Sequence, residues 1–266
     1  MPKQGSSSTD LSHLRDAVRG GVWDIGYGNS FCYIKVMSFI DYAQDFTKKE
    51  SLPEKKKRML GVIKFLKGKF PEAKIALNFE NPIQLLVAVI LSAQCTDKKV
   101  NQVTESIFKK YKTAKDFSKL TQVQLEKLVH SCGFYRAKAK NILSAIKTIE
   151  SKFSGKVPNT MKDILTLAGV ARKTANVVLG NAYNVVDGIA VDTHMIRINQ
   201  KLGFTKEKDP VKIEKDLMQL IPKNEWFSYT YRIINYGRGV CTARHKKCDC
   251  ELYQIKPSYA KATKGK

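Results

Sequence analysis

The sequence predicts an all-α protein, because helix signals recur along nearly the whole chain and no window shows the residue alternation of a sustained β-sheet. From Pro53 onward, capping residues, glycines and prolines delimit roughly ten helices. The 266 residues allow one large domain or two of ordinary size, and the 43% apolar fraction excludes disorder across the whole chain.

Each helix is recognised by the residues at its ends, where a polar N-cap or a proline starts it and a glycine or proline stops it. The expected boundaries, in order, are Pro53-Glu54 before the basic amphipathic segment 54–70; Asn81-Pro82 before the apolar run 82–93; the capping box Thr121 and Gln124, with a stop at Gly133; a helix over 137–153, closed by Gly155 and Pro158; Asn159 or Thr160 before 161–169; a helix over 173–179, ended near Gly180; Asp192 or Thr193 before 194–202, ended at Gly203; and Asp209-Pro210 before 211–221.

The charge of the chain points to a polyanionic partner. Lys and Arg number 47 against 24 acids, which gives a net charge of +23. Nucleic acid is favoured over an acidic membrane, because no basic amphipathic helix carries an aromatic face. The longest apolar run, 82–93, falls short of the ~20 residues of a membrane span, so we expect a buried helix and no integral membrane protein.

The N-terminal residues give two open interpretations. The first ten lack the apolar core of a secretion signal, so we expect no export. Residues 1–36 show no clear period, whereas a more regular sequence begins at Met37. Either Met37 is the true start, or residues 1–36 form a disordered or loosely docked extension. The last residues, 257–266, are expected to be a basic solvated tail.

Residues 164–179 (ILTLAGVARKTANVVL) predict two helices joined by a tight turn. Gly169 permits a positive φ at this turn. The second helix begins at Arg172 and Lys173, so its free N–H groups lie beside two cations. That arrangement binds a phosphate without reading base sequence. An ordinary connector with a basic surface is the alternative interpretation.

The segment 189–197 (IAVDTHMIR) places Asp192 before a helix. By itself this carboxylate is best explained as an N-cap. An amine from Lys173 and a carboxylate from Asp192 would, however, suit covalent attack on a sugar carbon with assisted proton transfer.

Four segments resemble, in order and spacing, the endonuclease III family of helix–hairpin–helix–Gly/Pro–Asp DNA glycosylases. They are LSAQCTD (91–97), LAGVARKTANVVL (167–179), VDTHMIR (191–197) and YGRGVC (236–241), and the resemblance covers about residues 54–256. It implies a bifunctional base-excision repair glycosylase with abasic-site lyase activity, acting on oxidised pyrimidines in duplex DNA. It also implies a monomer that does not bind membranes and that acts in the cytoplasm on the nucleoid.

The resemblance also implies a role for each matching residue. Lys173 matches the nucleophile that forms a Schiff base with the sugar, and Asp192 matches the catalytic aspartate. Gln94 matches a residue that fills the gap left by the flipped base, and Phe134 stands where the family has an apolar wedge. A buried helix amide and a core aromatic remain the alternatives for these two. The residues expected to contact DNA are Gln94, Phe134, Gly169, Val170, Ala171 and Arg172.

The family fold implies two helical domains with a DNA cleft between them. Residues 75–185 would form a six-helix barrel that carries the hairpin, and residues 54–74 with 186–256 would form the second domain. Residues 1–53 would be the N-terminal extension.

The hairpin departs from the family pattern Leu-Pro-Gly-Val-Gly. It reads Leu-Ala-Gly-Val-Ala over residues 167–171. Ala171 therefore requires that its position need no positive φ. We expect the phosphate contact to survive, because Gly169 and the helix N-terminus remain.

The cysteines depart further from the family, in which many members hold a [4Fe–4S] cluster with ligands spaced six, two and five residues apart. Of six cysteines, Cys241, Cys248 and Cys250 crowd near the C-terminus, which suggests metal chemistry in a reducing compartment. One residue is missing before Cys250, and Lys256 stands at the fourth ligand position. Three interpretations stay open: a loop without a cluster; a cluster completed by an outside ligand or left with three irons; and zinc bound by Cys241, His245, Cys248 and Cys250.

Two other functions compete with the glycosylase and lyase. One is a non-catalytic DNA-binding relic, which the decayed cysteine motif suggests. The other is a monofunctional mispair glycosylase, a group without a nucleophilic lysine at this helix. The presence of Lys173 and Asp192 together argues against both.

Overall fold

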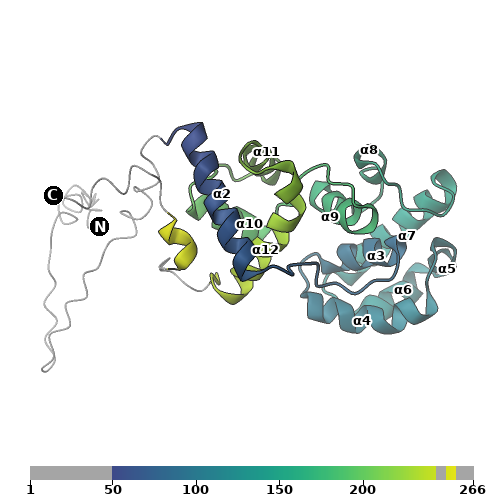
Figure 1. Cartoon of the computed structure of the whole chain (residues 1–266). Coiled ribbons are helices and arrows are strands. Elements are labelled where there is room, and N and C mark those ends of the chain that lie inside the picture. The colour runs from purple at the N-terminus through teal and green to yellow at the C-terminus, as the bar shows by residue number, and fades with distance from the viewer. Residues whose placement is uncertain (1–49, 244–249, 256–266) are drawn as a thin grey trace, which may run out of the picture. The chain divides into compact units, whose positions relative to one another are not determined.

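The computed structural model describes residues 50–243 and 250–255, and this part of the chain contains helices and no strand. The prediction of an all-α fold is confirmed. Figure 1 shows how the helices follow one another. In chain order they are α2 (Leu52–Lys69), α3 (Pro82–Ser92), α4 (Asp97–Lys110), α5 (Ala114–Ser118), α6 (Gln122–Val129), α7 (Tyr135–Lys152), α8 (Met161–Ile164), α9 (Arg172–Tyr183), α10 (Thr193–Lys201), α11 (Pro210–Leu220), the 3₁₀ turn η2 (Lys223–Glu225), α12 (Trp226–Gly239) and the 3₁₀ turn η3 (Glu251–Gln254).

Five of the predicted caps each precede a helix, namely Asn81, Thr121, Thr160, Asp192 and Asp209. Asn81 accepts a hydrogen bond from the Gln84 N–H (3.0 Å) ahead of α3, and Asp209 accepts one from the Lys212 N–H (2.9 Å) ahead of α11. Each bond satisfies one of the backbone donors that have no partner inside the helix. The first helix begins one residue earlier than predicted, because Ser51 forms a capping box with Glu54.

The apolar helix α3 is the centre of the first cluster of buried side chains. It packs against α4, α7 and α9 (Figure 1), and every residue from Ile83 to Leu91 is buried. Helices α5, α6 and α8 complete this cluster, which extends from Leu77 to Ala190. The hairpin before α9 is therefore held on a buried scaffold.

A second buried cluster joins parts of the chain that are far apart in sequence. Helix α2 packs against α11 and α12, and its Met59, Val62 and Leu66 share this cluster with residues from Ile189 to Tyr253. The division into two domains, with boundaries at 74–75 and 185–186, stays a prediction.

Three helix boundaries were predicted wrongly. Helix α6 ends at Val129 and not at Gly133. Helix α9 continues through Gly180 and ends at Tyr183, where Asn184 adopts a left-handed φ of 56°. The absence of a side chain at Gly180 instead lets the Phe227 ring pack closely against α9, since an added Cβ would lie 2.5 Å from that ring. The segment after Thr160 is helical for only four residues, α8, before the turn begins.

No helix in the described part of the chain is long and apolar enough to cross a membrane. Residues 1–49, 244–249 and 256–266 lie outside the description, and with them Met37, His245, Cys248, Lys256, the tail and most of the predicted extension.

Candidate active site

The predicted hairpin forms the turn between α8 and α9. Gly169 has a φ of +76°, and the Val170 N–H donates to Leu167 O (3.2 Å). Ala171 is the N-cap of α9 with a φ of −95°, so this position needs no glycine, as the sequence required. An alanine cap offers no side-chain acceptor, so the first N–H groups of α9 donate no hydrogen bond to a capping side chain. They remain donors for an anion.

Lys173 is the second residue of α9 and its side chain is exposed. The neighbouring Arg172 is half-buried and forms an ion pair with Glu214, whose Oε2 lies 2.6 Å from Arg172 Nε. The hydrogen bond from Arg172 to this carboxylate raises the pKa of Arg172 above its ordinary value. Of these two neighbouring cations, Lys173 is thus exposed to solvent, whereas Arg172 is bound to the buried carboxylate of Glu214.

Asp192 is the N-cap of α10, and its Oδ1 accepts a hydrogen bond from the Met195 N–H (2.8 Å). The side chain is half-buried. The capping interpretation is therefore correct, and it does not exclude a chemical role, because the bond uses one carboxylate oxygen. The cap fixes the direction of the second oxygen.

His194 lies in the first turn of α10 against the backbone of α12. An added Cβ at Gly237 would overlap its Nδ1, a buried atom that has no partner among the described residues. Burial lowers the pKa of His194, and Arg197 and Arg238 act in the same direction, while Asp192 opposes them. The imidazole beside Asp192 thus favours its neutral form near neutral pH.

Gln94 and Phe134 both lie at exposed turns with left-handed backbone conformations. Their φ angles are 52° and 55°, and the Phe134 side chain is 69% exposed. Neither is the buried helix amide or the core aromatic that the sequence left open as an alternative. The exposed ring of Phe134, at a backbone conformation that is uncommon for a residue with a Cβ, is accessible for contact.

A buried lysine connects these two turns. Lys138 Nζ donates to Leu91 O (2.9 Å) at the end of α3 and to Cys132 O (3.2 Å) just before Phe134. Burial lowers the pKa of Lys138. The turn with Gln94 and the turn with Phe134 are therefore held by one side chain from α7.

Of the predicted metal ligands, the structure describes Cys241 and Cys250, whereas Cys248 lies outside the described residues. Cys241 is fully buried, and its sulfur accepts a hydrogen bond from Arg197 Nη1 (3.1 Å) and lies 3.6 Å from the Tyr253 hydroxyl. Burial raises the pKa of this thiol, but the hydrogen bonds from Tyr253 and Arg197 outweigh it, so the net shift is downward. No group of three potential ligands exists within 50–243 and 250–255.

The ligand set does not fit a four-iron cluster. Such a cluster needs four thiolates, whereas the chain has three cysteines here and a lysine at the fourth position. Cys250 is half-buried before η3, and Cys248 lies outside the described residues.

Among the buried charged residues that sequence reasoning missed, Glu214 and Lys138 are the two bonded to the segments of the site. Each occupies a helix position on the apolar face, Glu214 beside Ile213 and Leu217, and Lys138 one turn before Ile142. A charge inside an apolar stripe was the available signal, because a charged group is rarely buried without a partner.

Comparisons with known proteins show the family of the chain. The profile of the HhH-GPD superfamily of base excision DNA repair proteins matches residues 87–223. The endonuclease III of Synechocystis sp. is 47% identical over 208 residues, which are 78% of this chain and 95% of the relative. This chain belongs to the endonuclease III family.

Further relatives support the assignment. The endonuclease III of Bacillus subtilis (strain 168) is 43% identical over 188 residues, 70% of this chain and 85% of that protein. The solved structure of a trapped endonuclease III–DNA covalent intermediate aligns with a TM-score of 0.72 and 39% identity, covering 78% of this chain and 98% of that one. The predicted family is confirmed, and the chain is a base excision repair enzyme of the DNA glycosylase and abasic-site lyase class.

Proposed function

We propose that the nucleophile of this endonuclease III family enzyme is the amine of Lys173, acting on duplex DNA that contains an oxidised pyrimidine or an abasic site. The observation that carries the proposal is the position of Lys173, exposed in the first turn of the hairpin helix α9. A relative that shares 39% of its residues forms a covalent intermediate with DNA, which supports an attacking side chain in this family.

The chemistry follows from an amine and an electrophilic sugar. The free amine of Lys173 attacks C1′, the bond from C1′ to the base breaks, and the base leaves with a proton. The sugar ring opens as the amine nitrogen forms an imine with C1′. The cationic imine acidifies the proton on C2′, and loss of that proton breaks the bond from C3′ to the phosphate oxygen. Water then hydrolyses the imine and releases Lys173.

Asp192 is proposed to serve the proton transfers and to stabilise positive charge as it develops on the sugar. Its N-cap bond to the Met195 N–H holds the carboxylate in one orientation, so no reorganisation is needed when charge appears. A preorganised charge is worth most where water is excluded, and the half-burial of Asp192 is in keeping with this.

The DNA contacts are proposed to come from three turns. The open N–H groups in the first turn of α9 would hold a backbone phosphate, with the turn from Gly169 to Arg172 against it and Val170 as the buried anchor of that turn. Gln94 would fill the space of the flipped base, and Phe134 would stack against the neighbouring base pair. The net charge of +23 favours such binding and makes it depend strongly on salt.

We further propose that the enzyme works as a monomer without an iron–sulfur cluster or zinc, since the cysteine ligand set is incomplete and the lyase steps need only the amine and the carboxylate. Its place of action would be the nucleoid, where its substrate lies. The DNA-binding relic and the mispair glycosylase are not favoured, because each leaves Lys173 without a use.

The test is borohydride trapping on duplex DNA with one abasic site, since borohydride reduces the imine to a stable amine. Wild type should give a covalent adduct, and Lys173→Ala should give none. Lys98→Ala is the matched control, because Lys98 is also exposed and is also the second residue of its helix, α4.

The outcomes are distinct. No adduct from folded, DNA-bound wild type would refute the lyase chemistry. An adduct that persists in Lys173→Ala would move the nucleophile to another residue. Loss of the adduct in Lys98→Ala as well would indicate that positive charge, and not the position of the amine, is what matters.

A further inference from the structure

The buried carboxylate of Glu214 joins the two segments that carry the proposed catalytic residues. Glu214 lies on α11 with only 3% of its surface exposed. Its Oε2 accepts from Arg172 Nε (2.6 Å), and its Oε1 accepts from Asn176 Nδ2 (3.0 Å) and from the Ile189 N–H (3.1 Å). Arg172 precedes Lys173 directly, and Ile189 is three residues before Asp192.

Close packing and hydrogen bonds restrict the orientation of the Glu214 carboxylate. Gly188 lies so close that an added Cβ would overlap Oε1 and would also lie 3.1 Å from Arg172 Nη2 and from Asn176 Nδ2. A glycine at this point lets the backbone before Ile189 approach the carboxylate. Three donors and the close packing define the orientation of the side chain more tightly than a surface ion pair could.

We propose that Glu214 is a positioning residue, which fixes the first turn of α9 to the backbone that leads into Asp192 and so sets the placement of the Lys173 amine relative to the Asp192 carboxylate. This inference rests on the proposed roles of Lys173 and Asp192. Attack by a positioned amine is sensitive to small displacements, and an error of about 1 Å can slow a step by about 100-fold. Because Glu214 bonds both to the start of α9 and to the backbone before Asp192, we expect it to affect the reaction rate more than the affinity for DNA.

Glu214→Gln is the sharpest perturbation that the geometry allows. The glutamine carbonyl can replace Oε1 and keep the two neutral donors, Asn176 and Ile189. Its amide group then faces Arg172, where a donor meets a donor, so the change breaks only the connection to the start of α9.

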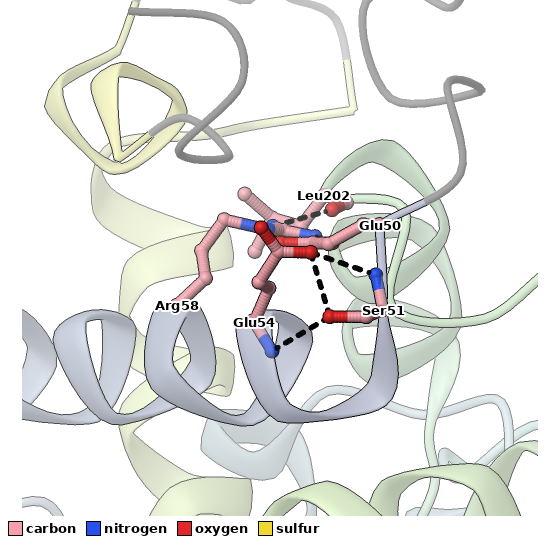
Figure 2. A network of polar contacts seen from close by, with 5 residues as sticks. All are labelled: Glu50, Ser51, Glu54, Arg58 and Leu202. Atoms are coloured by element: carbon pink, nitrogen blue, oxygen red, sulfur yellow. Dashed lines mark hydrogen bonds and ion pairs between the residues drawn. The ribbon is translucent and has the colours of Figure 1, made fainter.

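The chain offers a matched control in a second buried ion pair. Arg58 donates through Nε and Nη2 to both oxygens of Glu50 (2.9 and 2.8 Å), and both side chains are at most 4% exposed. Figure 2 shows these residues with Ser51, Glu54 and Leu202. Arg58 also donates to Leu202 O (2.8 Å), at the end of α10. Glu50→Gln thus perturbs an ion pair at the start of α2 whose hydrogen bonds among the described residues run between Arg58, Glu50 and Leu202, and not to α9 or to the Ile189 backbone.

The experiment measures three quantities for wild type, Glu214→Gln and Glu50→Gln. They are the single-turnover rate of strand cleavage at an abasic site with enzyme in excess, the dissociation constant for duplex DNA with a reduced abasic site, and the urea midpoint. We expect Glu214→Gln to slow cleavage by about tenfold or more with less than about threefold change in affinity. Glu50→Gln should lower the urea midpoint but leave the rate within about twofold of wild type.

Equal rates for Glu214→Gln and wild type, or equal losses of rate in both variants, would overturn the inference and leave Glu214 a structural residue. If Glu214→Gln does not fold, Asn176→Ala removes one donor only and should slow cleavage by about threefold at unchanged affinity. An unchanged rate in that variant would likewise overturn the inference. A wild type that binds DNA but neither cleaves nor traps it would instead refute the proposed function, and this inference with it.

Discussion

Replacing Gly169 with alanine should destabilise the protein by a calculable amount. At a φ of +76°, a residue with a Cβ costs about 1–2 kcal/mol, and the Cβ would lie 2.9 Å from the Asn141 Cβ, an overlap that costs about 1–3 kcal/mol to relieve. Alanine also restricts the unfolded chain, which returns about 0.4–1 kcal/mol. The net loss in the free energy of unfolding is therefore about 1–5 kcal/mol.

Urea denaturation followed by circular dichroism measures this loss as a lower midpoint at an unchanged slope. Gly68→Ala is the control, because Gly68 lies in α2 with no atom near its added Cβ, and the helix should gain up to about 1 kcal/mol. Asn141→Gly in the Gly169→Ala background removes the overlap but not the backbone strain. The double-mutant cycle separates the two contributions.

Two results would refute this reasoning. A Gly169→Ala protein as stable as wild type would mean that the turn does not hold a positive φ. A coupling free energy of zero between positions 169 and 141 would mean that the hairpin does not pack on α7 as described.

Three further predictions use other parts of the site. Lys138→Met leaves two buried carbonyl oxygens without their lysine donor and should lower the free energy of unfolding by about 1–3 kcal/mol in urea, so wild-type stability would contradict the connection between the turns. Burial lowers the pKa of His194, so the unfolded chain binds more protons than the folded chain as the pH falls through 6.5, and the free energy of unfolding should decrease over that range. His194→Asn should flatten this pH dependence of the free energy of unfolding. An unchanged dependence would contradict the burial of the ring. Protein from iron-supplemented cells should contain well under one iron per chain, and a chelator should leave its melting temperature unchanged; stoichiometric iron with sulfide would contradict the proposal of an enzyme without a cluster.

The sequence by itself determined the features that depend on a few neighbouring residues. Caps such as Asp192 and the positive φ of Gly169 follow from local sterics and from backbone donors that need an acceptor within three residues. The family follows from motifs whose order and spacing survive in the sequence, including Lys173. The incomplete cysteine set is also a local feature, because it depends only on which residue types stand at a few spacings near the C-terminus.

Only the tertiary structure decided which distant residues meet. Gly180 was predicted to end a helix, whereas the approach of Phe227 from α12 explains the glycine inside α9. The partners of Glu214 come from α9 and from the Ile189 backbone, 42 to 25 residues away in sequence. A buried charge is stable only with partners that the fold brings to it, and no local pattern specifies those partners. The exposure of Phe134, likewise, was settled by packing and not by its residue type.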